Sequence, residues 1–239
     1  MPKAILVDTS RCTACRGCQV GCKEWKSLPA NNTKQRGSHQ NPPDLNAYNF
    51  KLVRFSEHLI DGNVRWYFFP DQCRHCDYPP CMATAELEGS IIQDESTGAV
   101  IFTEKTKGED FEAIREACPY NIPRKDEKTG QIVKCDMCID RIQAGMQPMC
   151  VKSCAMGAMQ FGDRASILKK AEQRLAEVKK EFPKAQLLDS SSVNVVFLVM
   201  DDPALYHEFA IASAPEPKTR HQWLARLVQP FNAVKVKNI

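Results

Sequence analysis

The sequence predicts an α+β fold in which cysteine-rich loops alternate with short strands, hairpins and few helices. Twelve cysteines fall into four groups. Apolar residues recur in short runs bounded by turn residues, which is typical of hairpins, and one longer stretch has helical spacing. With 239 residues, 43% of them hydrophobic, the chain is long enough for one or two domains with a packed core.

Most of the remaining elements are predicted to be short. Residues 4–7 form a strand that leads into the first cysteine loop, and residues 19–25 form a helical turn. Hairpins follow, in which turn residues separate apolar runs. They pair 50–55 with 64–69 across Asp61, Gly62 and Asn63, pair 90–93 with 99–102 across DESTG, and place the turn DEKTG (126–130) before a strand at 131–134.

Two longer segments lie outside the cysteine groups. Residues 28–48 are rich in Asn, Pro and Gln without an apolar period, which predicts a long loop that either clamps a partner or is a solvated insertion. Asp163 is predicted to cap a helix that runs to about Phe182. The apolar face of that helix comprises Leu168, Ala171, Leu175, Val178 and Phe182. Lysines on its other face either steer an acidic redox partner or are merely solvated.

The first cysteine group is typical of an iron-sulfur loop. Cys12, Cys15, Cys18 and Cys22 have the spacing C-x2-C-x2-C-x3-C. Three thiolates in one short loop suit a cubane cluster, because three of its corners then face the same stretch of backbone. A zinc site usually pairs two C-x2-4-C knuckles from separated segments, so the run favours iron and sulfur over zinc.

The other cysteines complete three sets of four. In two-cluster ferredoxins the last cysteine of each run ligates the cluster of the other run. Applying this exchange to the first and fourth groups gives set 1 and set 2, and the second group with the solitary Cys118, which precedes Pro119, gives set 3. The sets are Cys12, Cys15, Cys18 and Cys154 (set 1); Cys135, Cys138, Cys150 and Cys22 (set 2); and Cys73, Cys76, Cys81 and Cys118 (set 3). We therefore predict three [4Fe-4S] clusters that use every cysteine.

The ligands of a fourth cluster are missing together. Complete second and third runs would carry cysteines near Ala85 and at Gly108, Phe111 and Ile114. Under the exchange rule these four positions would serve a single cluster, so their joint loss agrees with the proposed pairing. Phe111 and Ile114 either fill the vacated volume with apolar packing or belong to a plain core helix.

The chain resembles the ferredoxin-type beta subunits of molybdopterin oxidoreductases. The motifs that carry the resemblance are RCTACRGCQVGCKEW, CRHCDYPPC and CDMCIDRIQAGMQPMCVKSCAMGAMQFGD, within residues 3–165. It is most similar to the three-cluster subunit of tungsten- or molybdenum-containing formate dehydrogenases of sulfate-reducing bacteria, since four-cluster relatives keep the cysteines that are absent here.

The resemblance implies a role and an organisation. The expected role is electron transfer, without catalysis, from a molybdopterin (W or Mo) alpha subunit in a heterodimer to a soluble acceptor such as a multihaem cytochrome c. The expected fold is a duplicated bacterial-ferredoxin-like iron-sulfur domain with inserted hairpins and loops over residues 1–162, into which the second and third groups insert a module at about 70–125. Residues 163–239 are expected to be a C-terminal helical extension that packs on the core or on the catalytic subunit. Set 3 is expected to lie farthest from that subunit.

The expected location follows from the resemblance rather than from a leader. The first cysteine comes too early to leave room for a signal peptide, which alone would indicate the cytoplasm. By resemblance, the subunit is exported to the periplasm with a catalytic partner that bears a twin-arginine signal. Residues 193–200 form the longest apolar run, which is too short to span a bilayer, so no membrane anchor is predicted.

Other functions are disfavoured by the sequence. A net charge of +3 with no interleaved basic and aromatic residues argues against nucleic-acid binding, and thus against a redox-sensing regulator. No catalytic motif or dinucleotide fingerprint is present. The tight C-x2-C spacings argue against disulfides. A zinc-stabilised module, or the subunit of a sulfoxide, nitrite or polysulfide reductase, are the remaining alternatives.

Some residues near the cysteines have two readings. His75, between Cys73 and Cys76, is predicted to be a non-ligand that either hydrogen bonds to sulfur or lies at the surface. Positive charge close to a cluster favours its reduced form, although ordinary solvation explains such residues equally well. The basic residues next to cysteines in sequence are Arg16, Lys23, Arg141 and Lys152.

Overall fold

A four-stranded sheet joins the first residues of the chain to the residues that follow the last cysteine group. The computed structural model describes residues 2–212. The sheet has the order β8-β1-β10-β9. Its strands are β1 (Lys3–Asp8), β8 (Met159–Asp163), β9 (Gln186–Leu188) and β10 (Val195–Val199). β1 runs antiparallel to β8 and parallel to β10, and Ile5 pairs with Phe161 on one side and with Val195 on the other.

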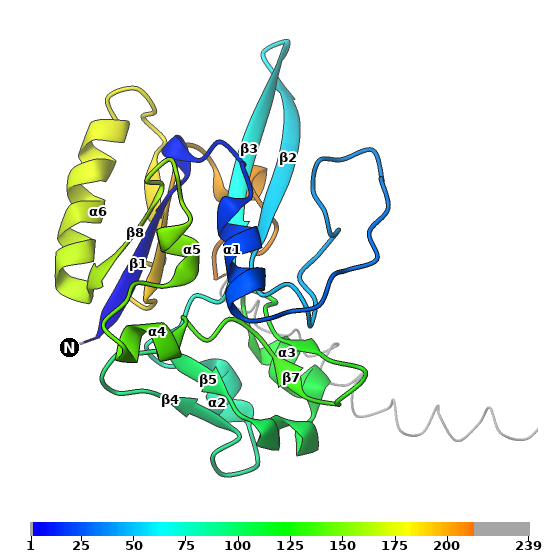
Figure 1. Ribbon diagram of the computed structural model, residues 1–239. Coiled ribbons are helices and arrows are strands. Elements are labelled where there is room, and N and C mark those ends of the chain that lie inside the picture. Colours follow the sequence, from blue (N-terminus) through cyan, green and yellow to red (C-terminus); the bar gives the residue numbers. More distant parts are fainter. Residues whose placement is uncertain (1, 213–239) are drawn as a thin grey trace, which may run out of the picture.

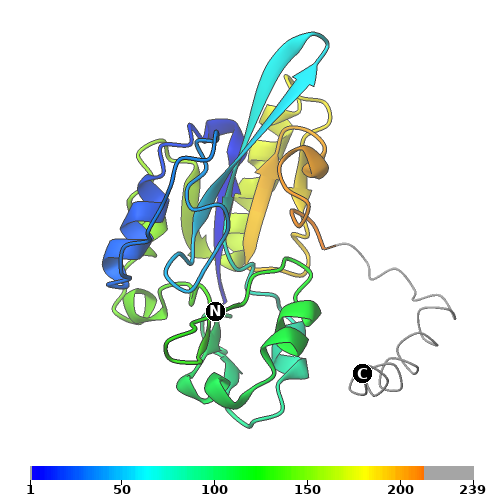
Figure 2. The same cartoon turned by 90° about the vertical axis from the view of Figure 1, so that its right-hand side faces the viewer.

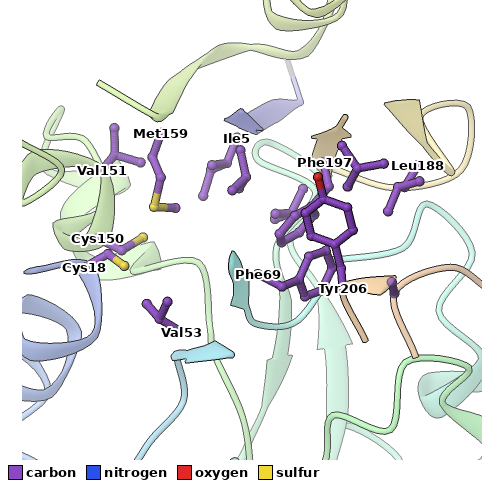
Figure 3. Packing of buried hydrophobic residues seen from close by; sticks show 14 of the residues in the cluster. Ile5, Cys18, Val53, Phe69, Cys150, Val151, Met159, Leu188, Phe197 and Tyr206 are labelled. Carbon is purple, nitrogen blue, oxygen red and sulfur yellow. The ribbon is translucent and has the colours of Figure 1, made fainter. Parts of the chain in front are cut away.

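The two faces of this sheet bury different partners. Ala4 and Leu6 of β1 point toward helix α6 (Arg164–Val178), where Ile167 and Ala171 are buried against them. The alternate residues face the cysteine-bearing side, because successive side chains of a strand point to opposite faces. There Ile5, Val7 and Phe197 pack with Phe69 and Tyr206, and the sulfur-bearing side chains of Cys18, Cys150 and Met159 lie in the same cluster (Figure 3). The sheet is therefore buried on both sides.

The region after residue 162 differs from the extension that the sequence predicts. Strands β9 and β10 lie inside the central sheet, and β10 is the direct neighbour of β1. The physical reason is the apolar run at 193–200, in which all five residues of β10 are buried, as expected of a strand covered on both faces. Helix α6 also differs, since it ends at Val178. Asp163 is its N-cap residue, as predicted, but the Asp163 side chain makes no capping hydrogen bond and instead accepts one from Lys3 Nζ at 2.6 Å. Residues 213–239 of the predicted extension lie outside the described residues.

The cysteine loops are followed by short helices on one side of the sheet. They are α1 (Gly17–Trp25), α4 (Ile139–Gln143) and α5 (Met149–Lys152), and the 3-10 turn η1 (Thr9–Arg11) leads from β1 into the first loop. Helix α1 packs closely on α5 (Figure 1). At Gly21 a Cβ atom would overlap the Ser153 side chain, so glycine permits this approach. The approach brings Cys18 and Cys22 of α1 toward Cys150 of α5.

A long hairpin projects from the body of the molecule (Figures 1 and 2). Its strands β2 (Leu52–Ile60) and β3 (Asn63–Asp71) are longer than predicted. The turn is confirmed at Asp61 and Gly62, both of which have positive φ, while Asn63 already pairs with Ile60. The base of the hairpin is buried at Phe69, and its last strand leads directly into the second cysteine group. The hairpin thus connects the two cysteine-bearing regions.

The second and third cysteine groups lie in a region of short elements below the sheet in Figure 2. These elements are α2 (Pro80–Thr84), β4 (Ile91–Gln93), β5 (Val100–Phe102), the 3-10 helix η2 (Glu104–Gly108), α3 (Phe111–Ala117), β6 (Arg124–Lys125) and β7 (Ile132–Val133). The predicted hairpin β4–β5 and the turn at 126–130 are confirmed. Phe111, Ile114 and Ala85 pack in one apolar cluster with Cys81 and Ile132. Three positions where a fourth cluster would have its ligands therefore contribute to an apolar core.

The remaining chain has little regular structure. Residues 28–48 form the predicted long loop, apart from one bridge between Asn46 and Asn49. The 3-10 turn η3 (Pro203–Leu205) follows β10. Among residues 2–212, no helix has the length and apolar character that crossing a membrane requires.

We predict that Gly21→Val destabilises the protein. The added side chain must displace Ser153 and separate α1 from α5, and overpacking of this kind costs about 1–3 kcal/mol. Thermal or denaturant unfolding followed by circular dichroism measures the loss. The control is Val20→Ala on the same helix, where the side chain is 57% exposed and the expected change is within about 0.5 kcal/mol. Equal stability of the two variants would contradict the proposed role of Gly21.

Candidate metal centres

Sets 1 and 3 each surround a cavity. One cavity is lined by Cys12, Cys15, Cys18 and Cys154 together with apolar side chains that include Val53 and Met159. The other is lined by Cys73, Cys76, Cys81 and Cys118, with several prolines around them. Cys154 thus lies beside the first cysteine run although more than 130 residues separate them in sequence. Both cavities are almost entirely apolar, so the sulfur atoms are their main potential ligands.

Set 2 lies deeper in the protein. Cys22, Cys135, Cys138 and Cys150 are all buried. Burial raises the pKa of the Cys135 thiol well above its ordinary value, and the proximity of Cys22, Cys138 and Cys150 raises it further. The exchanged cysteine Cys22 therefore lies among the thiols of the fourth group. Cys150 also faces Cys18 of set 1 (Figure 3), so the two sets are neighbours.

Three of the cysteine loops share one backbone conformation. The residue before the second cysteine of each C-x2-C pair has a positive φ: 54° at Ala14, 49° at His75 and 61° at Met137. Such values are uncommon for residues other than glycine and persist where the surrounding structure fixes them. In each loop the amide of this residue donates to the sulfur of the preceding cysteine, at 3.3 Å for His75 and 3.4 Å for Met137. The same local structure thus turns both sulfur atoms of each pair inward.

The thiols suit a metal cluster rather than free cysteine chemistry. Burial raises the pKa of Cys12 to about 11 and that of Cys81 and Cys150 to about 12, and neighbouring cysteines add to the effect. Without metal these groups therefore stay protonated at neutral pH. Metal ligation requires the thiolate, so cluster loading releases protons and supplies the positive charge that the buried sulfurs need.

The geometry is less suited to zinc. A zinc ion brings its sulfur ligands to within about 2.3 Å of one point. Across the described residues, no three His, Cys, Asp or Glu side chains converge closely enough to hold a single metal ion. The cysteines of sets 1 and 3 instead each line a cavity, an arrangement that suits the corners of a multi-iron cluster.

Two buried lysines near the cysteines were not predicted from the sequence. Lys51 is only 1% exposed, and its positive charge lowers the pKa of Cys18 in set 1 and of Cys150 in set 2. Lys134 is 7% exposed and lines the cavity of set 3. Lys134 directly precedes Cys135, and this position could have identified it. Lys51 is more than twenty residues from the nearest cysteine in sequence, so its position gave no such indication.

The basic residues that the sequence singled out mostly have structural contacts. Arg16 donates to the His39 carbonyl, and Lys23 donates to Tyr48 O at 2.8 Å, so both fasten the loop 28–48. Arg141 is buried over the Trp25 ring. Lys152 is exposed. The loop is therefore attached to the first cysteine region.

His75 is fully buried, which removes the surface alternative. Its Nδ1 accepts a hydrogen bond from the Val100 amide at 3.0 Å. Burial lowers its pKa well below 6.5, and the Lys134 ammonium acts in the same direction, so the ring is neutral. The proton consequently resides on Nε2.

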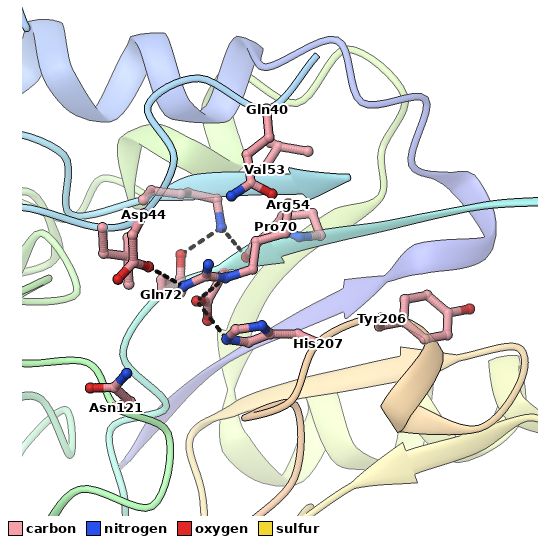
Figure 4. A network of polar contacts seen from close by, with 12 residues as sticks. Gln40, Asp44, Val53, Arg54, Pro70, Gln72, Asn121, Tyr206 and His207 are labelled. Carbon is pink, nitrogen blue, oxygen red and sulfur yellow. Dashed lines mark hydrogen bonds and ion pairs between the residues drawn. The ribbon is translucent and has the colours of Figure 1, made fainter. Parts of the chain in front are cut away.

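An ionic network joins the hairpin to the loop 28–48 (Figure 4). Arg54 donates to Asp71 at 2.8 Å and to Asp44 at 2.7 Å, and Arg124 donates to the other oxygen of Asp44 at 2.6 Å. Arg74 adds a second cation to buried Asp71. Burial lowers the pKa of nearby His207 to about 4, so that histidine is neutral and contributes no charge at pH 7. The network holds together the loop 28–48, the base of the hairpin, the second cysteine group and the segment that follows Cys118.

The fold and the thiol-lined cavities define a ferredoxin-like iron-sulfur protein. A family model for a 4Fe-4S dicluster domain matches residues 64–164. The chain is 57% identical over 216 residues to the formate dehydrogenase 2 subunit beta (cytochrome c-553) of Nitratidesulfovibrio vulgaris, covering 88% of this chain and 99% of the relative. It is 54% identical over 215 residues to the formate dehydrogenase subunit beta of Megalodesulfovibrio gigas, covering 89% and 100%.

Relatives of lower identity include subunits of another formate dehydrogenase and of a reductase. The formate dehydrogenase-O iron-sulfur subunit of Escherichia coli is 35% identical over 238 residues, covering 97% of this chain and 78% of the relative. A subunit of the anaerobic dimethyl sulfoxide reductase of the same organism is 30% identical over 166 residues, covering 69% and 75%. The chain belongs to the iron-sulfur beta subunits of formate dehydrogenases. It is thus an electron-transfer subunit that binds [4Fe-4S] clusters and serves a catalytic subunit.

We predict that Asp71→Asn is strongly destabilising. The substitution leaves Arg54 and Arg74 buried without their shared counter-charge, and breaking a buried pair in this way costs about 3–5 kcal/mol. The matched control is Asp163→Asn, which removes a half-exposed pair with Lys3 worth at most about 1 kcal/mol. Denaturant unfolding of both variants gives the comparison. Similar midpoints would show that the network contributes little to stability.

Proposed function

We propose that this subunit carries electrons from formate oxidation through three [4Fe-4S] clusters, held by sets 1, 2 and 3, to a soluble cytochrome c. A cluster of this kind takes up and gives up one electron at a time. The observation that carries the proposal is the proximity of the cysteines within each set, because sets 1 and 3 each line one cavity and the thiols of set 2 are buried beside one another. The name of the Nitratidesulfovibrio relative, which includes cytochrome c-553, supports the choice of acceptor.

The burial of the three sets supports a serial order. Set 2 consists only of buried cysteines, whereas sets 1 and 3 each include cysteines that reach the surface or lie close to it. Set 2 therefore suits the middle position, and sets 1 and 3 suit the two ends. We assign set 3 to the outer end, nearest the acceptor.

The surroundings of set 3 suit an exit. Tyr78, between Cys76 and Cys81, is 92% exposed, and Met82 and Leu87 are exposed nearby in sequence. Exposed aromatic and apolar side chains of this kind are common where a partner docks. A cytochrome that docks transiently next to set 3 would receive the electron over a shorter distance.

The remaining parts of the proposal concern the partner and the location. We propose a molybdopterin alpha subunit with tungsten or molybdenum, a heterodimer, and export to the periplasm with that partner. The two relatives above 50% identity are both formate dehydrogenase subunits, while the reductase subunit reaches only 30%. This difference favours formate oxidation over a reductase in which electrons would flow in the opposite direction.

The first test is the cluster content. Anaerobically purified protein is expected to hold about twelve irons and about twelve acid-labile sulfides per chain, four of each for every cubane. Colorimetric iron and sulfide assays with elemental analysis for zinc provide the numbers. About eight irons would remove set 3 from the proposal, and about three zincs per chain would refute iron-sulfur binding.

The second test is the order of the sets. In the complex with its catalytic subunit, Cys81→Ala is expected to spare formate oxidation with an artificial dye that takes electrons upstream of set 3. Reduction of the cytochrome is expected to fall by at least about tenfold. Co-purification of both subunits serves as the control for assembly. Equal loss of both activities in an assembled complex would contradict the outer position of set 3.

A further inference from the structure

Lys51 is a buried cation without a carboxylate partner. Its Nζ donates to Pro70 O at 2.9 Å and to Gln72 Oε1 at 2.7 Å, and within residues 2–212 it forms no ion pair. Both acceptors are neutral. A buried ammonium group is costly unless an opposite charge lies close by, because neutral acceptors replace its hydration only in part. The fold thus places a positive charge where its ordinary partner is missing.

Lys134 repeats this arrangement at another place. Its Nζ donates to Val100 O at 2.5 Å and to Cys135 O at 3.0 Å, and it lies 4.7 Å from the centre of the Phe102 ring. No carboxylate of the described chain pairs with it either. Lys51 and Lys134 are the only buried lysines in that part of the chain.

Each lysine lies beside cysteine sets. Lys51 Nζ donates to the carbonyl of Pro70, which lines the cavity of set 1. Its positive charge lowers the pKa of Cys12 and Cys18 in set 1 and of Cys22 and Cys150 in set 2. Its acceptor Gln72 Oε1 lies 3.9 Å from Cys150 Sγ, so the ammonium is close to the boundary of the two sets. Lys134 lines the cavity of set 3, and its positive charge lowers the pKa of Cys81 and Cys118. Its Nζ also donates to the carbonyl of Cys135, a member of set 2.

We propose that Lys51 and Lys134 are the built-in counter-charges of the iron-sulfur sites. Lys51 raises the reduction potentials at sets 1 and 2, and Lys134 raises the reduction potential at set 3. An electron that arrives adds negative charge, which a nearby buried cation favours in a region where water screens little. This inference rests on the proposed function, because it takes the three sets as cluster sites.

The arrangement also explains why lysines are used at these positions. A compact ammonium on a flexible stem donates to carbonyl oxygens that converge from different segments, whereas a planar guanidinium suits paired carboxylates. The buried arginines Arg54, Arg74 and Arg124 do contact Asp44 or Asp71. Arg141, which is also buried without a carboxylate partner among the described residues, instead lies over the Trp25 ring and donates to Gln147 O.

The test uses Lys51→Met and Lys134→Met in the complex with the catalytic subunit. Redox titration followed by electron paramagnetic resonance counts the clusters whose potential changes. At a fixed potential, the ratio of reduced to oxidised cluster is expected to fall on the order of tenfold, which is about 59 mV for a one-electron couple. Two clusters are expected to shift in Lys51→Met. The cluster that stays unchanged there is expected to shift in Lys134→Met.

Matched variants separate charge from packing. Lys152→Met removes an exposed lysine between two cysteines of the fourth group and is expected to leave the potentials within about twofold in this ratio, because solvent screens that charge. Lys51→Arg keeps the charge and is expected to keep the native potentials. If Lys51→Met fails to load clusters while Lys51→Arg loads them, the charge requirement still stands.

Two outcomes would overturn the inference. One is a full complement of iron and sulfide in both methionine variants with unchanged potentials. The other is loss of clusters in Lys51→Met and Lys51→Arg alike, which would make the role of Lys51 one of packing. A wild-type protein without three clusters would instead refute the proposed function, so the two failures are distinguishable by the iron and sulfide content of the unmodified chain.

Discussion

The structure depends on the burial of sulfur atoms that face one another. Most of the thiols have raised pKa values because burial disfavours the thiolate, and each set crowds four of them together. Such an arrangement is stable as thiolates only when positive charge is brought to it, by the irons of a cluster and by cations of the protein. The strained residues Ala14, His75 and Met137 have the same origin, because the loops must turn their sulfurs inward at the expense of favourable backbone conformations.

The central sheet brings together cysteines of the same set that lie far apart in sequence. Set 1 needs Cys154 beside Cys12, and set 2 needs Cys22 beside Cys135. Strand β1 precedes the first group and β8 follows the last one, so their pairing brings both groups together. Helix α1 against α5, with Gly21 at the contact, then completes the approach. The fold thus reduces the entropy that cluster assembly alone would have to overcome.

Spacing predicted the cysteine groups, the hairpin turns and the loop 28–48, because local chemistry determines each of them. Turn residues determine hairpins, and the C-x2-C spacing determines which thiols share a loop. Sequence could not place β10 beside β1, since a buried apolar run does not reveal its neighbour. It also missed Lys51, whose burial depends on how the hairpin, the first loop and α5 meet in space. The extension predicted from residue 163 was wrong at β9 and β10 for the same reason: periodicity shows the type of element but not its partner.

Apolar packing fills the positions at which the sequence would place the ligands of a fourth cluster. Ala85, Phe111 and Ile114 pack with Ile91, Val100 and Ile132, so dispersion and burial of apolar surface hold together what a metal site would otherwise hold. That apolar core borders the cavity of set 3 at Cys81 and Val100. In such surroundings a single cation has a long reach, since little solvent screens it. The apolar packing at these positions and the burial of Lys134 therefore belong to one region, in which solvent screens the charge of that lysine only weakly.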